Sequence, residues 1–574
     1  MFASGSPPLT LRPAIIAPRV FADSLRLLIC FAFATAQPVC AEQNLANAAE
    51  TSTEPSVGYA DQYLFEDDVT DAGVLEMAIR EPPGQRFVGF ESSLYSGNDN
   101  LLGDELELGG RATWRRQSLD FGLLEAELQL SNYDSTFLNR AARGNQAILT
   151  FRQSELAVSD SWVMNNTFGH QRTRISTLLH SGYRYRLPSS PLLGATSELI
   201  GKSSRLRFTT GKTGVYRGVA LPRFEETGGE LTLLDFESRY NDNLDVGGTL
   251  VFVDGDDDVR DHKSLLLAGR YTSPDSNHEH TARVLADDDG NIGFWTDSYQ
   301  QLANGPAVRY GVFYFDPRLA WTDEPIPNDQ YGAYVRSDVY TFRTSLSLGY
   351  DYLETGAGGY NLAQSRSHST FLTSNLRLRR NFSIGLNGSL AQRRFSGGAF
   401  DDDQLAWRVG GYTSFELPAG QARVEIFSSE LNSEFPTNSR ELRGIWTTFN
   451  WRLPEKLRLT NELRVEWNND LFGDTRRDEL ATQLRYDLMD HFSWGVNATM
   501  FATTRDVFGR DRGFGFSTDA RWNFLPNWYA SVIANYNTEA FESDPTGLLA
   551  RSRTSERNTF WLTVGYARAS GRPH

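Results

Sequence analysis

Charged side chains that recur at every second residue are the first groups in this sequence that could do chemistry. They lie in three segments and comprise Glu125, Glu127, Asp235, Glu237, Arg239, Arg458, Glu462, Arg464 and Glu466. Because both signs are present, such a surface could guide a polar solute or polymer, or could line a water-filled interior in which the charges pair with one another. We predict that all nine face a hydrated lumen, and we give precedence to the plainer role of mutual pairing.

Runs of aspartate form a second group of candidates. They are Asp254/Asp256/Asp257/Asp258, Asp287/Asp288/Asp289 and Asp401/Asp402/Asp403. Oxygen-rich loops can bind Ca²⁺ or bridge to lipopolysaccharide through divalent ions. The segment Asp287–Asn291 nevertheless lacks the ligand spacing and the distal glutamate of a calcium loop. We therefore interpret the runs as solvated acidic loops and predict neither a metal site nor a cofactor.

Two histidines raise the question of catalysis. His170 and His180 flank a stretch that contains Arg172, Arg174 and Ser176. A hydrolase needs a nucleophile, a base and a group that orients the base, and no such spaced set is present. The sequence also has no HExxH, GxSxG or phosphate-binding glycine loop in a suitable context. We predict no catalytic residue and no enzyme.

The segments that carry the alternating charges have the period of a β-strand. In Leu124–Leu130 and Leu457–Trp467, apolar residues take one face and charged residues the other. The same alternation recurs in 234–240, 492–500 and 514–524. A period of two predicts strands that have one apolar and one polar face.

Short connections interrupt these strands at regular intervals. They begin at Arg380, Leu417, Leu453, Met489 and Leu525, which is about every 36 residues. Longer polar segments fall midway between the short ones, and further back along the chain, at 254–262, 287–291, 316–329, 354–369, 397–404, 433–439, 470–478 and 541–557. Tight turns at one end and long loops at the other are the layout of a transmembrane barrel.

Composition is compatible with that layout. The mean hydropathy of −0.43 is low for a membrane protein, and no apolar run reaches the ~20 residues of a membrane helix. A barrel reconciles both facts, because only every second residue of a strand faces lipid. We predict an all-β fold, namely a transmembrane antiparallel up-and-down β-barrel of about 22–26 strands over residues 86–566.

The N-terminus has the layout of a secretory signal peptide. Arginines precede or open a short apolar stretch, Leu27–Ala36, and small residues follow it. We predict a signal peptide over residues 1–41. Both cysteines, Cys30 and Cys40, would leave with it, so the mature chain would have no disulfide. Residues 42–85 are predicted to be a flexible periplasmic leader or a small insert in the barrel mouth.

Two further stretches depart from the strand repeat. Residues 187–227 fit it worst, because they are rich in proline and glycine. They predict either two irregular strands or a plug, since wide lumens are usually plugged. Alternation from Phe560 to Tyr566 predicts the last strand, which a tail at 567–574 follows.

The layout resembles large outer-membrane β-barrel proteins of Gram-negative bacteria as a class. The strand count and the irregular stretch around Tyr216–Leu221 are also faintly similar to the translocation pore of fimbrial ushers, a large barrel with a plug between early strands. The folded periplasmic domains of an usher are expected to be missing. Exopolysaccharide export porins are a second analogy at the level of the fold.

The layout and the resemblance together imply a location in the cell outer membrane. The expected function is a channel or export pore for a polar polymer or solute, in polysaccharide or protein secretion. Two alternatives stay open, a structural or surface-display protein with acidic extracellular loops and an outer-membrane hydrolase. Expected partners are outer-membrane lipid, lipopolysaccharide, the barrel-assembly machinery and periplasmic export partners, whereas the net charge of −16 argues against nucleic acid.

Overall fold

The computed structural model describes most of residues 86–570. The exceptions are 101–102, 137–141, 181–183, 256–260, 303–304, 323–325, 327, 357–363, 398–400, 436–438, 454–455, 472, 490, 506–508 and 543–552. The predicted signal peptide and leader lie outside the described residues.

The described chain is built almost entirely of strands. They are β1 (Arg86–Asp99), β2 (Gly103–Ser118), β3 (Gly122–Ser135), β4 (Ala142–Ser159), β5 (Trp162–Arg172), β6 (Pro191–Gly201), β7 (Ser204–Arg217), β8 (Arg223–Asn241), β9 (Leu244–Gly255), β10 (His262–Thr272), β11 (His278–Asp287), β12 (Ile292–Gln301), β13 (Ala307–Phe315), β14 (Gln330–Tyr340), β15 (Thr344–Thr355), β16 (Gln364–Arg379), β17 (Phe382–Ser396), β18 (Asp402–Leu417), β19 (Gly420–Ser433), β20 (Arg440–Arg452), β21 (Leu457–Asp470), β22 (Gly473–Met489), β23 (Phe492–Arg505), β24 (Gly509–Leu525), β25 (Trp528–Glu542) and β26 (Arg553–Ser570). A single helical turn, α3 (Thr177–His180), is the only helix in the described residues. No helix of the described chain is long and apolar enough to cross a membrane.

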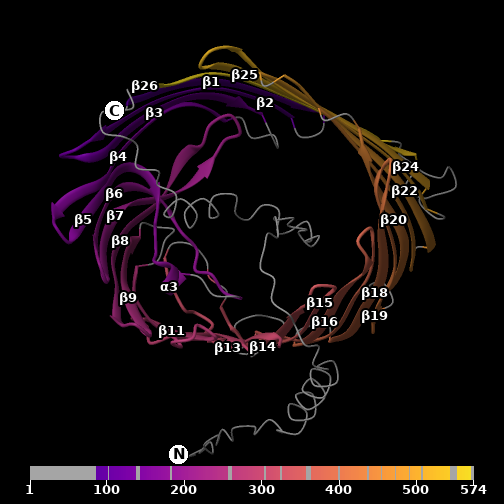
Figure 1. The fold of residues 1–574 in the computed structure, drawn as a ribbon, viewed down its shortest axis with the longest axis horizontal. Coiled ribbons are helices and arrows are strands. Elements are labelled where there is room, and N and C mark those ends of the chain that lie inside the picture. Colours follow the sequence, from indigo (N-terminus) through magenta and orange to yellow (C-terminus); the bar gives the residue numbers. More distant parts are fainter. Residues whose placement is uncertain are drawn as a thin grey trace, which may run out of the picture. The chain divides into compact units, whose positions relative to one another are not determined.

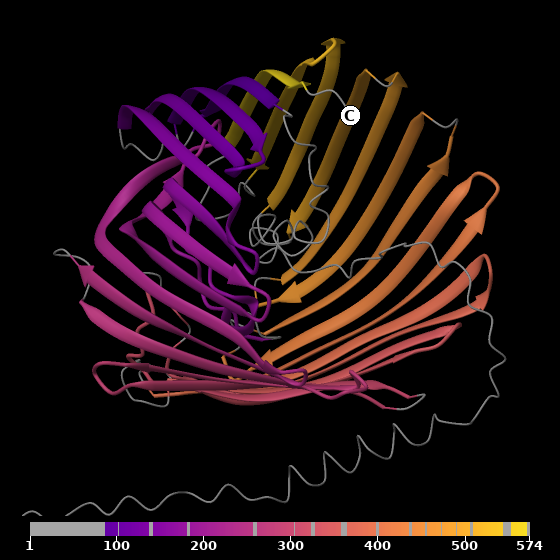
Figure 2. The ribbon, with the colours of Figure 1, turned by 60° about the vertical axis from the view of Figure 1, so that its left-hand side comes forward.

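The strands close into one barrel. Each strand pairs antiparallel with the next along the chain, and β26 pairs back with β1 from Arg86↔Ser570 to Asp99↔Arg557. Closure leaves no unpaired sheet edge, which is what a strand structure in lipid requires. Figure 1 shows the ring of strands and Figure 2 shows their tilt. The predicted all-β up-and-down barrel is confirmed, with 26 strands, the upper limit of the predicted range.

Connections are short at one end of the barrel and mostly longer at the other. Residues 380–381, 418–419 and 526–527 join strand pairs at the short end, where the sequence predicted turns. The predicted long loop at 470–478 is wrong, because β21 runs to Asp470 and β22 starts at Gly473. Ion pairs between residues two apart on β22 favour the extended strand there, since such residues share a face.

The outer face of the barrel is apolar. Leu128, Phe252 and Ile426 are 40%, 43% and 60% exposed, and large apolar residues recur at this face around the ring. Exposure to water would cost about 25 cal/mol for each Å² of apolar surface, whereas a bilayer accepts such a band. A closed antiparallel barrel with this face and with tight turns at one end is an outer-membrane barrel, as predicted.

The stretch 187–227 is mostly barrel wall, so the alternative of two irregular strands describes most of it and a plug does not. β6 and β7 pair from Ile200↔Arg205 to Leu192↔Thr213. Beyond that point β7 pairs only with β8, and β8 reaches β9 only from Gly229 onward. The hairpin 214–228 therefore leaves the wall. Pro191 is tolerated because it is the first residue of its strand.

The last strand is longer than predicted. β26 ends at Ser570 rather than at Tyr566, because its final residues pair with Arg86–Gly89 at the start of β1. The first half of the predicted tail is thus part of the wall.

Two connections fold into the barrel. We call residues 173–190, which join β5 to β6 and contain α3, the first inward segment, and residues 316–329, which join β13 to β14, the second inward segment. Figure 1 shows α3 inside the ring. Their apolar side chains share one core with the inner faces of β8 to β13. Its members include Leu178, Leu179, Leu187, Leu319, Trp321 and Ile326 from the segments, and Leu231, Leu233, Val251, Val253, Leu266, Leu285, Trp295, Phe313 and Phe315 from the wall.

Candidate transport lumen

The predicted charges of β8 lie on the inner face of the wall. Asp235, Glu237 and Arg239 alternate with exposed apolar residues that face lipid, and they share their face with the leucines that contact the first inward segment. Arg239 pairs with Asp245 of β9 at 3.5 Å. Glu237 lies opposite Arg205 of β7 in the register.

Asp235 belongs to a buried ion-pair network. It is 3% exposed and accepts a hydrogen bond from Thr249 Oγ1 at 2.9 Å. Arg207 lies 3.6 Å from it and also pairs with Glu198 of β6. The same guanidinium donates to the backbone carbonyl of Arg174 in the first inward segment. The network therefore fastens that segment to the wall, and Arg207, its centre, was missed in the sequence.

The predicted charges of β3 pair across neighbouring strands. Glu125 accepts from Arg115 of β2 at 3.0 Å and from Arg152 of β4 at 2.6 Å. Glu127 lies 3.9 Å from Arg111 of β2. These carboxylates are thus paired with arginines of the neighbouring strands.

The predicted charges of β21 belong to a repeated pattern. Arginine and glutamate two residues apart pair along one strand on the inner face, as in Arg423–Glu425 of β19 (3.1 Å), Arg464–Glu466 of β21 (2.6 Å) and Arg477–Glu479 of β22 (2.9 Å). Arg458 lies opposite Arg452 of β20 and Arg485 of β22 in the register. Glu462 lies on the same face of β21, between Arg458 and the Arg464–Glu466 pair. The inner wall of this half is thus polar, with many of its charges locally neutralised.

The hairpin 214–228 is held by a residue that the sequence analysis did not identify. Glu107 of β2 is 3% exposed and accepts hydrogen bonds from the backbone N–H groups of Val219 and Ala220, both at 2.7 Å. Arg223 of β8 also donates to it at 3.3 Å. The leucines that flank Glu107 gave a strand pattern, but no local signal marks this glutamate as the acceptor for a distant turn.

We expect Glu107→Ala to release this hairpin. Hydrogen bonds to a charged acceptor contribute about 1.5–3 kcal/mol each, so loss of the carboxylate should raise the open population at least about tenfold. Trypsin should then cleave faster after Arg217, the exposed residue that precedes the tip. Glu105→Ala, two residues away on the same strand, is the matched control. Equal cleavage rates of the two variants would contradict the role of Glu107.

The second inward segment is fastened by polar residues of the wall. Asp287, from one of the aspartate runs, accepts the N–H of Ala320 at 3.1 Å, and Ser264 donates to the carbonyl of Ala320 at 2.8 Å. His262 lies 3.1 Å from the carbonyl oxygen of Trp321. Part of this run therefore has a structural role. No group of three metal-ligating side chains is gathered anywhere in the described residues.

The first inward segment also contacts the neighbouring wall strands β14 and β15 and the second inward segment. Arg184 pairs with Asp351 of β15. Burial raises the pKa of Tyr185 to about 12, so its hydroxyl stays protonated and donates to Gln330 of β14 at 2.9 Å. Ser190 donates to Thr322 at 3.0 Å, which links the first segment to the second.

The candidate histidine site does not come together in the described residues. His170 packs edge-on against Phe224 of the inward hairpin, with ring centroids 4.8 Å apart. Ser176 is buried in the first inward segment, where its carbonyl accepts the N–H of Leu179. The side chain of His180 lies outside the described residues.

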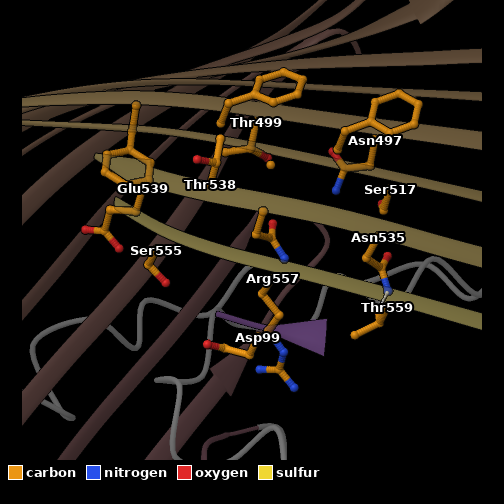
Figure 3. Close-up of a pocket in the computed structure, with 15 residues that line it drawn as sticks. Asp99, Asn497, Thr499, Ser517, Asn535, Thr538, Glu539, Ser555, Arg557 and Thr559 are labelled. Atoms are coloured by element: carbon orange, nitrogen blue, oxygen red, sulfur yellow. Dashed lines mark hydrogen bonds between the residues drawn. The ribbon is translucent and has the colours of Figure 1, made fainter. Parts of the chain in front are cut away.

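Two hollows lie in the opposite part of the wall. One of about 590 Å³ lies on β23 to β26 and the end of β1, and the other, of about 520 Å³, lies on β20 to β23. Figure 3 shows Asn497, Ser517, Asn535 and Thr559 following one another across four strands in the first hollow. The register places these four residues directly opposite one another.

A second row runs beside the first. Thr499, Gly515, Asn537, Arg557 and Asp99 are successive partners in the register from β23 to β1. At Gly515 a Cβ atom would lie 2.8 Å from Asn537 Oδ1, so a larger residue would push the amide aside. Glycine in this row thus lets the polar side chains lie close to the wall.

Neither a protein family nor a characterised protein matches this chain in sequence. Among solved structures it is similar to the translocation pore of the P pilus usher PapC, with 12% identity over 84% of this chain and 99% of that chain and a TM-score of 0.39. It is also similar to the siderophore receptor PirA from Pseudomonas aeruginosa (10% identity, 85% and 81% covered, TM-score 0.37) and to the copper transporter OprC (11% identity, 85% and 81% covered, TM-score 0.38). The strand pairing itself, rather than these likenesses, establishes that the chain is a closed outer-membrane barrel.

Proposed function

We propose that the chain is an outer-membrane channel through which a polar solute or polymer passes along the inner wall formed by β19 to β26. The observation that supports this proposal is the unequal division of the inner face. From β8 to β13 that face holds an apolar core that the two inward segments cover, and its ion pairs, such as Arg283–Asp297, are buried beside that core. From β19 to β26 it carries paired charges, amides and hydroxyls, and two hollows.

A polar inner wall is the surface that a hydrated path needs. A paired arginine and glutamate can be solvated by water or by each other, with little difference in free energy. Neutral amides offer both hydrogen-bond donors and acceptors. Because the pairs on β19, β21 and β22 are locally neutral, this path should discriminate little between small cations and anions.

We expect the refolded full-length protein to give current steps in a planar bilayer, with weak selectivity between K⁺ and Cl⁻. Arg464→Glu replaces one member of a lumen pair and should shift the reversal potential towards cation selectivity. The matched control is Arg443→Glu, which breaks the same kind of pair, Arg443–Glu441, on the opposite face of the neighbouring strand β20. That change should leave the reversal potential where it was.

Two results would contradict the channel. One is the absence of current from protein whose heat-modifiable migration shows that it is folded, and this would favour the surface-display alternative. The other is an equal shift in selectivity from both arginine variants, which would mean that ions do not pass along this wall.

A further inference from the structure

We propose that the two hollows of β20 to β26 form one binding track for an uncharged, hydroxyl-rich carbohydrate chain. This inference rests on the proposed channel and names the class of molecule that the channel would carry.

The first hollow is lined mainly by neutral groups that both donate and accept hydrogen bonds. They are Asn497, Thr499, Ser517, Asn535, Asn537, Ser555 and Thr559. A carbohydrate hydroxyl is likewise both donor and acceptor, so amides and hydroxyls match it in either orientation. Asp99, Glu539 and Arg557 also line this hollow, and two carboxylates against one guanidinium leave it close to neutral. A strongly charged polymer would instead call for a large excess of one sign.

The polar groups are arranged as rows rather than as a point site. Neighbouring strands lie about 4.8 Å apart, so the row from Asn497 through Ser517 and Asn535 to Thr559 offers one polar group at each such step. The side-chain amide of Asn535 donates one N–H to Thr559 Oγ1 at 2.9 Å, which fixes the orientation of the amide. The amide oxygen and the second N–H can then bind a ligand. A row of this kind suits an extended chain with hydroxyls along its length.

The two hollows meet at an arginine–phenylalanine stack. Phe501 lines the first hollow, Arg477 lines the second, and the guanidinium lies 4.7 Å from the ring centroid. Arg477 is also paired with Glu479 at 2.9 Å, so this junction is locally neutral. Planar groups of this kind pack against the C–H faces of sugar rings, while the guanidinium edge donates to hydroxyls.

Charge balance in the second hollow points to the same ligand class. Arg440, Arg477 and Arg505 line it together with Glu466 and Asp470. Arg505 is paired with Asp511 at 2.7 Å, and Glu466 is paired with Arg464 at 2.6 Å. Arginines and carboxylates held by one another present fixed hydrogen-bonding groups without a large net field, which is what recognition of an uncharged polar chain needs.

The experiment measures binding of defined chains to the folded full-length protein in detergent by calorimetry, and block of its current in bilayers. The probes are dextran oligomers and cello-oligosaccharides as neutral carbohydrates, oligogalacturonate as an acidic carbohydrate, and a glycine–serine peptide of similar length. We expect the neutral carbohydrates to bind best, with little change between 0.1 and 1 M NaCl because no net charge is neutralised.

Variants test whether the rows are the site. Asn535→Ala combined with Asn537→Ala should weaken binding of the neutral chain about thirtyfold, since each of the two amide hydrogen bonds contributes about 1 kcal/mol. Arg477→Gln should weaken it as well. The matched controls are Asn375→Ala on β16 and Arg408→Gln on β18, where Arg408 stacks on Phe427 outside both hollows. Both control proteins should bind as the parent does.

The outcomes separate this inference from the channel itself. Current steps without binding of either neutral carbohydrate would overturn the carbohydrate track and leave the channel standing. Stronger binding of oligogalacturonate or of the peptide would also overturn it. A third outcome is that the parent protein binds the neutral chain and passes no current, while the asparagine variants lose this binding. That outcome would support the track and contradict transport.

Discussion

Replacing Arg207 with alanine should destabilise the barrel more than any other single change at its inner wall. Arg207 is 5% exposed, and its guanidinium lies between the carboxylates of Glu198 and Asp235 and donates to the carbonyl of Arg174. Removing one partner from a buried network leaves the others as uncompensated charges, at a cost of about 3–5 kcal/mol. We expect the temperature at which the folded band is lost on unheated gels to fall clearly.

Arg205→Ala is the control for this prediction. Arg205 reaches the same carboxylate of Glu198 at 3.4 Å, but its side chain is 29% exposed and retains access to water. A pair whose arginine reaches water contributes less than a fully buried one, and Glu198 keeps Arg207 as its partner, so this variant should stay closer to the parent than Arg207→Ala does. If both variants lose the folded band at the same temperature, burial of Arg207 is not what makes it important. Asp235→Asn in the Arg207→Ala background should recover part of the loss, because it removes one unpaired charge.

The wall could be predicted from the sequence because its signals are local. Alternation in Leu457–Trp467 reports directly that one face meets lipid and the other water. The short turns at 380–381, 418–419 and 526–527 fix where strands end, and their spacing fixes how many there are. Neither inference requires knowledge of contacts between residues that are distant in sequence.

The inward segments could not be predicted because their contacts are distant in sequence. The wall strands that the inward segments cover do carry a signal, namely continuous apolar runs such as Leu265–Leu267. In a strand that faces an open lumen, apolar and polar residues should alternate instead. Such runs indicate strands that are covered on both faces. The stretch 187–227, rich in proline and glycine, instead left open irregular strands or a plug. Pro191 only opens β6, and most of the stretch is wall.

The same reason separates the site residues that were predicted from those that were missed. Glu125 and Glu466 stand in alternating segments, so their side of the strand could be inferred from their neighbours. Glu107 also stands in an alternating segment, so its face could be inferred in the same way. Its role, however, depends on contact with Val219, in a turn more than 100 positions away in sequence. The hollows depend on registers between four strands, which no single segment encodes.

Leu179→Asp should release the first inward segment and widen the lumen. Leu179 is fully buried in the core between this segment and the wall. An unpaired carboxylate in that apolar site costs about 3 kcal/mol or more, enough to shift the segment about a hundredfold towards a detached state. The strands need not unfold, because their hydrogen-bonded ladder does not include the segment. We therefore expect higher single-channel conductance, and faster tryptic cleavage after Arg184, from a protein that still shows the folded band.

Leu179→Met is the matched control, since it nearly conserves volume and polarity and should leave the segment attached. The two readouts also divide the explanations. A rise in cleavage without a rise in conductance would mean that the segment detaches but does not narrow the path, which would place the conducting route entirely along β19 to β26. A rise in both would show that the covered half of the barrel is a fixed constriction, and that its apolar core sets the width left for cargo on the polar side.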